Sequence, residues 1–104
     1  MYNGKKPGSP ESFTLSQNYP NPFNPRTVIR YTIPMTSEVT LRIFDVLGNE
    51  VMSFNYESKE SGNYQEIIDA SSLATGLYLY KLEVHNKSNN EEIFSDSRKM
   101  LVIK

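Results

Sequence analysis

The residues that could perform acid–base, nucleophilic or metal chemistry are few in this sequence. Its 104 residues include no cysteine and a single histidine, His85. Without cysteine there is no disulfide framework, thiolate zinc site or cysteine nucleophile, and one imidazole cannot form the paired-histidine motif of zinc hydrolases. Because His85 follows a strand-like run and precedes a polar segment, we interpret it as the solvent-exposed end of a strand.

Carboxylates and hydroxyls give no stronger case for catalysis. Asp45 and Asp69 could act as an acid–base pair, but each stands beside turn-forming residues, and we interpret both as turn residues. The Ser71–Ser72 pair lacks the Gly-x-Ser-x-Gly elbow of a serine hydrolase. The acidic residues between positions 91 and 96 lack the spacing of a calcium loop. We therefore expect no enzyme, no metal, no cofactor and no small-molecule substrate.

Composition points to one modest domain. Hydrophobic residues make up 38% of the chain and aromatic residues 12%, which is enough for a single core at this length. The net charge of −1 gives no reason to expect binding to nucleic acid or to an anionic membrane. Residues 1–12 are rich in Gly, Pro, Ser and charge, so we expect a flexible linker there and the domain at residues 13–104.

Alternation of apolar and polar residues predicts short strands along the rest of the chain. The runs are Thr27–Ile33, Glu38–Phe44, Glu50–Tyr56, Tyr64–Ile68, Leu77–Val84 and Ile93–Lys104, after a brief alternation from Phe13 to Gln17. Their spacing predicts an all-β fold, an Ig-like antiparallel β-sandwich of about seven strands. The segment Leu73–Tyr78, with a glycine before a strand-initial tyrosine, fits the tyrosine corner of such a sandwich.

A segment rich in asparagine and proline is the first candidate for recognition. It consists of Asn18, Tyr19, Pro20, Asn21, Pro22, Phe23, Asn24 and Pro25. The prolines exclude a helix and favour extended backbone. We expect Tyr19 and Phe23 to plug one end of the sandwich, and the same rigid segment could be read by a partner.

Two further apolar features stand at positions where a partner could reach them. Val46 and Leu47 fall in a predicted hairpin tip, where they either pack on a neighbouring segment or face a partner. The final run, Lys99, Met100, Leu101, Val102, Ile103 and Lys104, is apolar on both faces. As an inner strand it needs no further explanation, whereas as an edge strand it would be a template for strand addition.

These blocks together resemble a known family. Leu15–Pro34 closely resembles the opening signature of the type A C-terminal sorting domain of type IX secretion, found in Bacteroidota and their relatives. Val39–Val51 looks like the second block of that family, Gly62–Tyr78 like the third, and Lys99–Lys104 is similar to the terminal block. Many members carry a tryptophan near Ile67–Ile68, and this chain has none.

The resemblance implies a non-catalytic signal domain at the C-terminal end of a larger exported protein. Such a cargo passes through the periplasm to the cell surface or the medium. The implied partners are the outer-membrane translocon, its shuttle proteins and a surface sortase, which usually removes the domain. We expect the cut within Gly4–Ser12, and a monomer or a weak, strand-swapped dimer.

Two other interpretations stay open. The chain could be an accessory Ig-like module that binds carbohydrate or serves adhesion, in which case an exposed row of aromatic residues is expected. Tyr56 and Tyr64 are available for such a row, whereas Tyr78 and Tyr80 fall on the inward face of their strand. The chain could also be a purely structural spacer.

Overall fold

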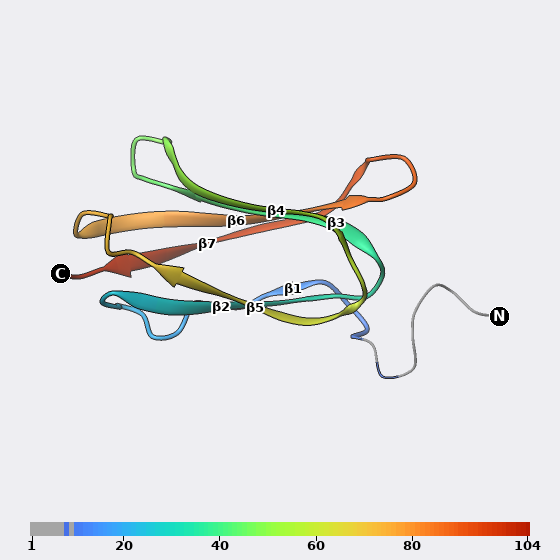
Figure 1. Cartoon of the computed structure of the whole chain (residues 1–104), viewed down its shortest axis with the longest axis horizontal. Coiled ribbons are helices and arrows are strands. Elements are labelled where there is room, and N and C mark those ends of the chain that lie inside the picture. Colours follow the sequence, from blue (N-terminus) through green and yellow to red (C-terminus); the bar gives the residue numbers. More distant parts are fainter. Residues whose placement is uncertain (1–7, 9) are drawn as a thin grey trace.

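The fold is an antiparallel β-sandwich, seen in a computed structural model that describes residues 8 and 10–104. Most of the predicted linker, residues 1–12, lies outside the described residues, so the domain boundary remains a prediction. The strands are β1 (Thr14–Leu15), β2 (Arg26–Ile33), β3 (Ser37–Phe44), β4 (Glu50–Lys59), β5 (Gly62–Asp69), β6 (Gly76–Asn86) and β7 (Glu92–Val102) (Figure 1). The described part contains no helix, and therefore no helix able to cross a membrane.

Seven strands in two antiparallel sheets confirm the predicted β-sandwich, and the structure adds the strand order, which the sequence did not predict. One sheet has the order β1-β2-β5 and the other the order β4-β3-β6-β7. Labelled as in immunoglobulin domains, these are A-B-E and C′-C-F-G. The strand β4 continues three residues beyond the predicted end at Tyr56, because Lys59 pairs with Ser37 across a register shift. The last three residues of β4 are polar and show no alternation of apolar and polar side chains. Backbone pairing with β3, and not the side-chain pattern, therefore extends this strand.

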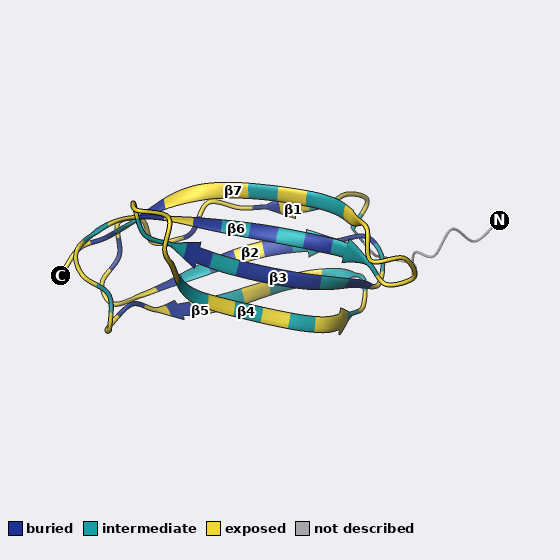
Figure 2. Ribbon diagram, turned by 90° about the horizontal axis from the view of Figure 1, so that it is seen from above, coloured by how far each residue is buried: buried dark blue, intermediate teal, exposed yellow. Residues whose placement is uncertain are grey.

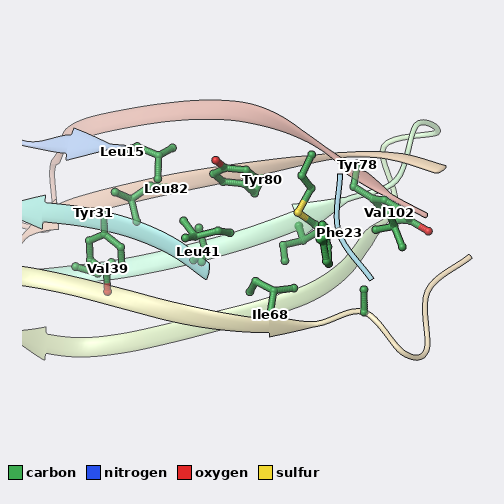
Figure 3. Packing of buried hydrophobic residues seen from close by; sticks show 14 of the residues in the cluster. Leu15, Phe23, Tyr31, Val39, Leu41, Ile68, Tyr78, Tyr80, Leu82 and Val102 are labelled. Atoms are coloured by element: carbon green, nitrogen blue, oxygen red, sulfur yellow. The ribbon is translucent and has the colours of Figure 1, made fainter. Parts of the chain in front are cut away.

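The core lies between the sheets, and side-chain alternation determines which residues enter it. The buried apolar residues are Leu15, Phe23, Ile29, Tyr31, Ile33, Val39, Leu41, Ile43, Ile68, Ala70, Tyr78, Tyr80, Leu82, Val84, Met100 and Val102 (Figure 3). The predicted inward residues of β2, β3 and β6 all belong to this set, namely Ile29, Tyr31, Ile33, Val39, Leu41, Ile43, Tyr78, Tyr80, Leu82 and Val84. Within the four-stranded sheet, burial is greatest in the central strands β3 and β6, while β4 and β7 at the sheet edges show more exposed positions (Figure 2).

Two predicted turns have the expected chemistry. The Tyr78 hydroxyl donates a 2.8 Å hydrogen bond to the Ala74 carbonyl, which is the tyrosine corner. Asp45 Oδ1 accepts the backbone N–H of Leu47 and of Asn49, each at 2.9 Å, and these bonds hold the pKa of Asp45 below its ordinary value. Gly48 has a φ of 86°, which a side chain would disfavour. The β3–β4 turn is therefore fixed by its own residues.

The side of the sandwich formed by β4 and β5 is joined by polar and aromatic contacts. The Tyr56 hydroxyl on β4 donates a 2.5 Å hydrogen bond to Glu66 Oε1 on β5. Lys59 Nζ stands 4.1 Å from the Tyr56 ring centroid and 4.0 Å from that of Tyr64, and Tyr64 stacks on Tyr31. These contacts connect the two sheets across an edge where no backbone pairing does so.

The Tyr56–Glu66 contact predicts how stability depends on alkaline pH. The hydrogen bond to Glu66, with burial and the carboxylate charge, raises the pKa of Tyr56 from 10.0 to about 12. The folded chain thus holds this proton more tightly than the unfolded chain, so the stabilisation is complete below pH 10 and is lost as the pH rises towards 12. We expect Tyr56→Phe to flatten the decline of unfolding free energy over this range, measured by urea denaturation at each pH. An unchanged decline would contradict the assignment.

Candidate recognition site

The residues that sequence chemistry singled out are in separate turns and strand ends. Asp69 accepts the backbone N–H and the hydroxyl of Ser71, and the hydroxyl contact is the main reason that the pKa of Asp69 is lowered. Asp45 is held in the β3–β4 turn. His85 lies half-buried one residue before the end of β6. Among the residues that the structure describes, no three His, Cys, Asp or Glu side chains gather as metal ligands.

The Asn/Pro segment lies along the edge of β2 in an extended conformation. Tyr19 and Val28 form an antiparallel bridge with two backbone hydrogen bonds of 3.0 Å. Extended backbone alternates its side chains, so Asn18 points inward and is 2% exposed while Tyr19 is 74% exposed. The prediction that Tyr19 plugs the core is therefore wrong, whereas the same prediction for Phe23, 3% exposed, is confirmed. The bonds Tyr19-Pro20, Asn21-Pro22 and Asn24-Pro25 are cis.

Buried hydrogen bonds hold Asn18 in the sandwich. Its backbone N–H donates to the Tyr80 hydroxyl at 2.8 Å, and that hydroxyl donates to the Ser16 carbonyl at 2.7 Å. The Asn18 amide donates to Thr27 Oγ1 at 3.0 Å, and the Thr27 hydroxyl donates to the Pro20 carbonyl at 2.8 Å. Burial raises the pKa of Tyr80, which favours the protonated hydroxyl that this arrangement needs.

Phe23 joins the Asn/Pro segment to the last strand. It forms a parallel bridge with Val102, in which the Phe23 N–H donates to the Leu101 carbonyl and the Ile103 N–H donates to the Phe23 carbonyl, both at 3.1 Å. The Leu101 N–H donates to Asn21 Oδ1 at 2.9 Å. The Phe23 ring enters the core near Val102 (Figure 3). Backbone pairing and apolar burial therefore act at the same residue.

Contacts on either side extend this junction. Gln17 Nε2 donates to the Lys99 carbonyl at 2.7 Å, and Arg98 Nε donates to the Leu15 carbonyl at 2.8 Å. Lys104 Nζ donates to the carbonyls of Ala70 and Ser71 at 3.0 and 2.8 Å. We call residues 18–25 together with residues 99–104 the terminal clasp. Both predicted recognition segments thus lie in one place.

The structure places residues 99–104 at the edge of a sheet, and their role in recognition stays a prediction. These residues end β7, which is an edge strand rather than an inner one. Met100 and Val102 point into the core, while Lys99, Ile103 and Lys104 are exposed. The edge is already covered at Leu101 and Ile103 by the Asn/Pro segment, so strand addition there would require displacement of Phe23.

The remaining positions of the Asn/Pro segment face solvent. Asn18 and Phe23 are buried, while Tyr19, Pro20, Asn21, Pro22, Asn24 and Pro25 are exposed. A rigid surface of alternating amide and apolar groups results. Sequence reasoning missed the residues that hold this surface, namely Gln17, Thr27 and the Tyr80 hydroxyl. The only signal was the inward position of Tyr80, which said nothing of its hydroxyl partner.

The aromatic residues that a carbohydrate-binding module would display do not form an open platform. Tyr56 and Tyr64 are half-buried, and Lys59 lies over both rings. Tyr78 and Tyr80 are in the core, as predicted. No observation on these residues favours the accessory-module interpretation.

Comparisons with known proteins agree with this description. The chain forms an Ig-like antiparallel β-sandwich in which residues 18–25 and the end of β7 are joined at one site. The family described as "Secretion system C-terminal sorting domain" matches residues 17–95, about three quarters of the chain, and the chain belongs to that family. It therefore carries a type IX secretion sorting signal of a protein exported through the cell envelope. Domains of this family are typically non-catalytic.

A solved structure also resembles the chain. It is the crystal structure of dimeric latent PorU from Porphyromonas gingivalis, with a TM-score of 0.67 and 19% sequence identity. The similarity covers 86% of this chain but only 9% of the PorU chain, and at this identity it supports the fold alone. No curated protein matches the chain. The family match ends at residue 95, before residues 99–104 of the clasp.

The Tyr80 hydroxyl predicts a measurable loss of stability. In Tyr80→Phe the buried Asn18 N–H and the Ser16 carbonyl lose their partner, which should cost about 1–3 kcal/mol of unfolding free energy in urea denaturation. The exposed Tyr19→Phe change should stay within about 0.5 kcal/mol. Hydrogen exchange at the Ile103 amide should accelerate in Tyr80→Phe, because the clasp is loosened. Equal stability of the two variants would contradict this role.

Proposed function

We propose that the terminal clasp is the surface through which the type IX machinery recognises this domain. The domain would direct a larger cargo from the periplasm across the outer membrane, and it would do so without catalysis of its own. Its partners would be the outer-membrane translocon with its shuttle proteins, and a surface sortase that removes the domain. The cargo would then reach the cell surface or the medium.

The single observation that carries the proposal is the pairing of Phe23 with Val102. It brings two segments about eighty positions apart in the sequence into one surface. A partner could contact Tyr19, 74% exposed, and Ile103, 46% exposed, without unfolding the sandwich. Since backbone hydrogen bonds and core contacts already fix this segment, little conformational entropy is lost when a partner binds it.

Removal by a sortase would need accessible chain before the sandwich. From Ser12 onward the chain is held: the Ser12 carbonyl accepts the Thr32 hydroxyl at 2.9 Å, and the Phe13 ring stacks on Phe94 with centroids 5.2 Å apart. Proteases act on segments that can leave the folded surface. Cleavage within residues 4–12 is therefore proposed.

The export role predicts that exposed clasp residues are needed for delivery. We expect a reporter fused before residues 1–104 to reach the surface of a type IX-competent cell, and Tyr19→Ser with Ile103→Ser to reduce delivery at least tenfold. Both side chains are exposed, so the sandwich should persist, checked by circular dichroism melting. The measurement is the ratio of the amount of reporter at the cell surface to the amount of reporter in the periplasm.

A matched control separates recognition from a general loss of apolar surface. Ile67 on β5 is 58% exposed and lies outside the clasp, so Ile67→Thr should leave delivery unchanged. Normal delivery of the folded Tyr19→Ser, Ile103→Ser double variant would reject the clasp as the recognition surface. Retention of the unaltered fusion inside the envelope would reject the export role itself.

The cleavage position can be tested on the released product. Mass spectrometry of the cargo recovered from the surface or medium should find its new C-terminus within residues 4–12. The physical reason is the attachment of Ser12 and Phe13 to the sandwich. A new C-terminus after Phe13 would contradict the proposal.

A further inference from the structure

The outer face of the four-stranded sheet contains a groove beside the β3–β4 turn. Its volume is about 510 Å³, and it is lined by Phe44, Val46, Leu77, Leu79, Lys81 and Lys99, among others. The connection between β3 and β4 rises away from β6 at the upper left of Figure 1. Phe44, Leu79 and Lys99 pair side by side across β3, β6 and β7 and form the floor.

Apolar side chains that face solvent concentrate at this groove. Val46 is 73% exposed, and Leu77 and Leu79 on the outer face of β6 are 43% and 37% exposed. The turn that carries Val46 is fixed by the hydrogen bonds of Asp45 and by Gly48, so the side chain is not free to fold back onto the sheet. A preformed apolar groove of this kind is typical of an interaction surface.

Charge at the rim indicates what would fill the groove. Among the described residues, Lys99 makes no ion pair, while Lys81 Nζ lies 3.5 Å from Glu83 Oε2. Glu83 is shared, because Arg42 Nε also approaches its Oε1 at 3.2 Å. The one carboxylate in the lining, that of Asp45, accepts N–H groups of its own turn, which lower its pKa and keep it negatively charged. The lining therefore holds two ammonium groups and one carboxylate, which is a net charge of +1.

We propose that this groove binds a segment of a partner protein in which a carboxylate stands next to apolar side chains. The apolar side chains would lie on Leu77, Leu79 and Val46, and the carboxylate would pair with Lys99. Lys99 also contributes its backbone carbonyl to Gln17 at the clasp, so the groove and the clasp adjoin at one residue. Docking here would be a second contact, separate from recognition of the clasp.

A second copy of the chain is a less suitable occupant. Outside the groove and its turn, the exposed apolar residue in the described part of the chain that has acidic neighbours is Ile67, which lies between Glu66 and Asp69 on β5. Insertion of β5 of one copy into the groove of another joins two different surfaces, which produces open chains of molecules rather than a closed dimer. A segment of a different protein can fill the groove without forming open chains of molecules.

Selection of peptides on the isolated 104-residue chain tests the proposal without export. Random octapeptides displayed on phage are selected on the immobilised chain and then synthesised for titration. We expect sequences with Asp or Glu beside Leu, Ile or Phe, and at least tenfold weaker binding to Val46→Ser with Leu79→Thr. Ile67→Thr and the Tyr19→Ser, Ile103→Ser clasp variant should bind as the unaltered chain does.

The charge is tested by reversal at the rim. Lys99→Glu should weaken the acidic peptides at least fivefold and should favour versions in which Lys replaces the acidic residue. No selected peptide, or selected peptides that bind the Val46→Ser, Leu79→Thr variant equally well, would overturn the proposal. Two other results would also overturn the proposal. One is self-association of the unaltered chain in sedimentation that the Val46→Ser, Leu79→Thr variant loses. The other is binding of the unaltered chain to phosphatidylglycerol vesicles instead of peptides, lost in the same variant.

Discussion

The backbone hydrogen bonds between Phe23 and the end of β7 hold together the two parts of the chain that we propose as the recognition surface. An edge strand leaves N–H and C=O groups without partners, and in this sandwich Phe23 and Asn21 supply partners at Leu101 and Ile103. Because the Phe23 ring is also part of the core, the segment cannot leave the edge without exposing apolar surface. The exposed face of the clasp is therefore as fixed as the sandwich beneath it.

Much of this fold follows from alternation alone. Ile29, Ile33, Leu41 and Ile43 are buried where a period of two places them, and the spacing of turns predicted the strand number and the sandwich, whereas the order of the strands in the sheets did not follow from the sequence. The β3–β4 turn and the tyrosine corner were predictable because Asp45, Gly48 and Tyr78 act through bonds to residues close in sequence.

The candidate site was harder to predict because its contacts are distant in sequence. Composition marked both Tyr19 and Phe23 as core residues, but the bridge of Tyr19 to Val28 determined that Asn18 turns inward and Tyr19 outward. The hydroxyl of Tyr80 meets Ser16 from a strand sixty-four positions away, and no local pattern encodes that pairing. Similarly, only pairing across three strands brings Phe44, Leu79 and Lys99 together in the groove.

The order in which a chain is synthesised gives the clasp a further consequence. Residues 18–25 leave the ribosome long before residues 99–104, so during translation Phe23 lacks the strand end with which it pairs. A nascent or prematurely ended chain has no closed clasp, however well β2 and β3 have formed. A receptor that reads the closed arrangement would thereby accept only molecules whose translation had proceeded to the end of this domain.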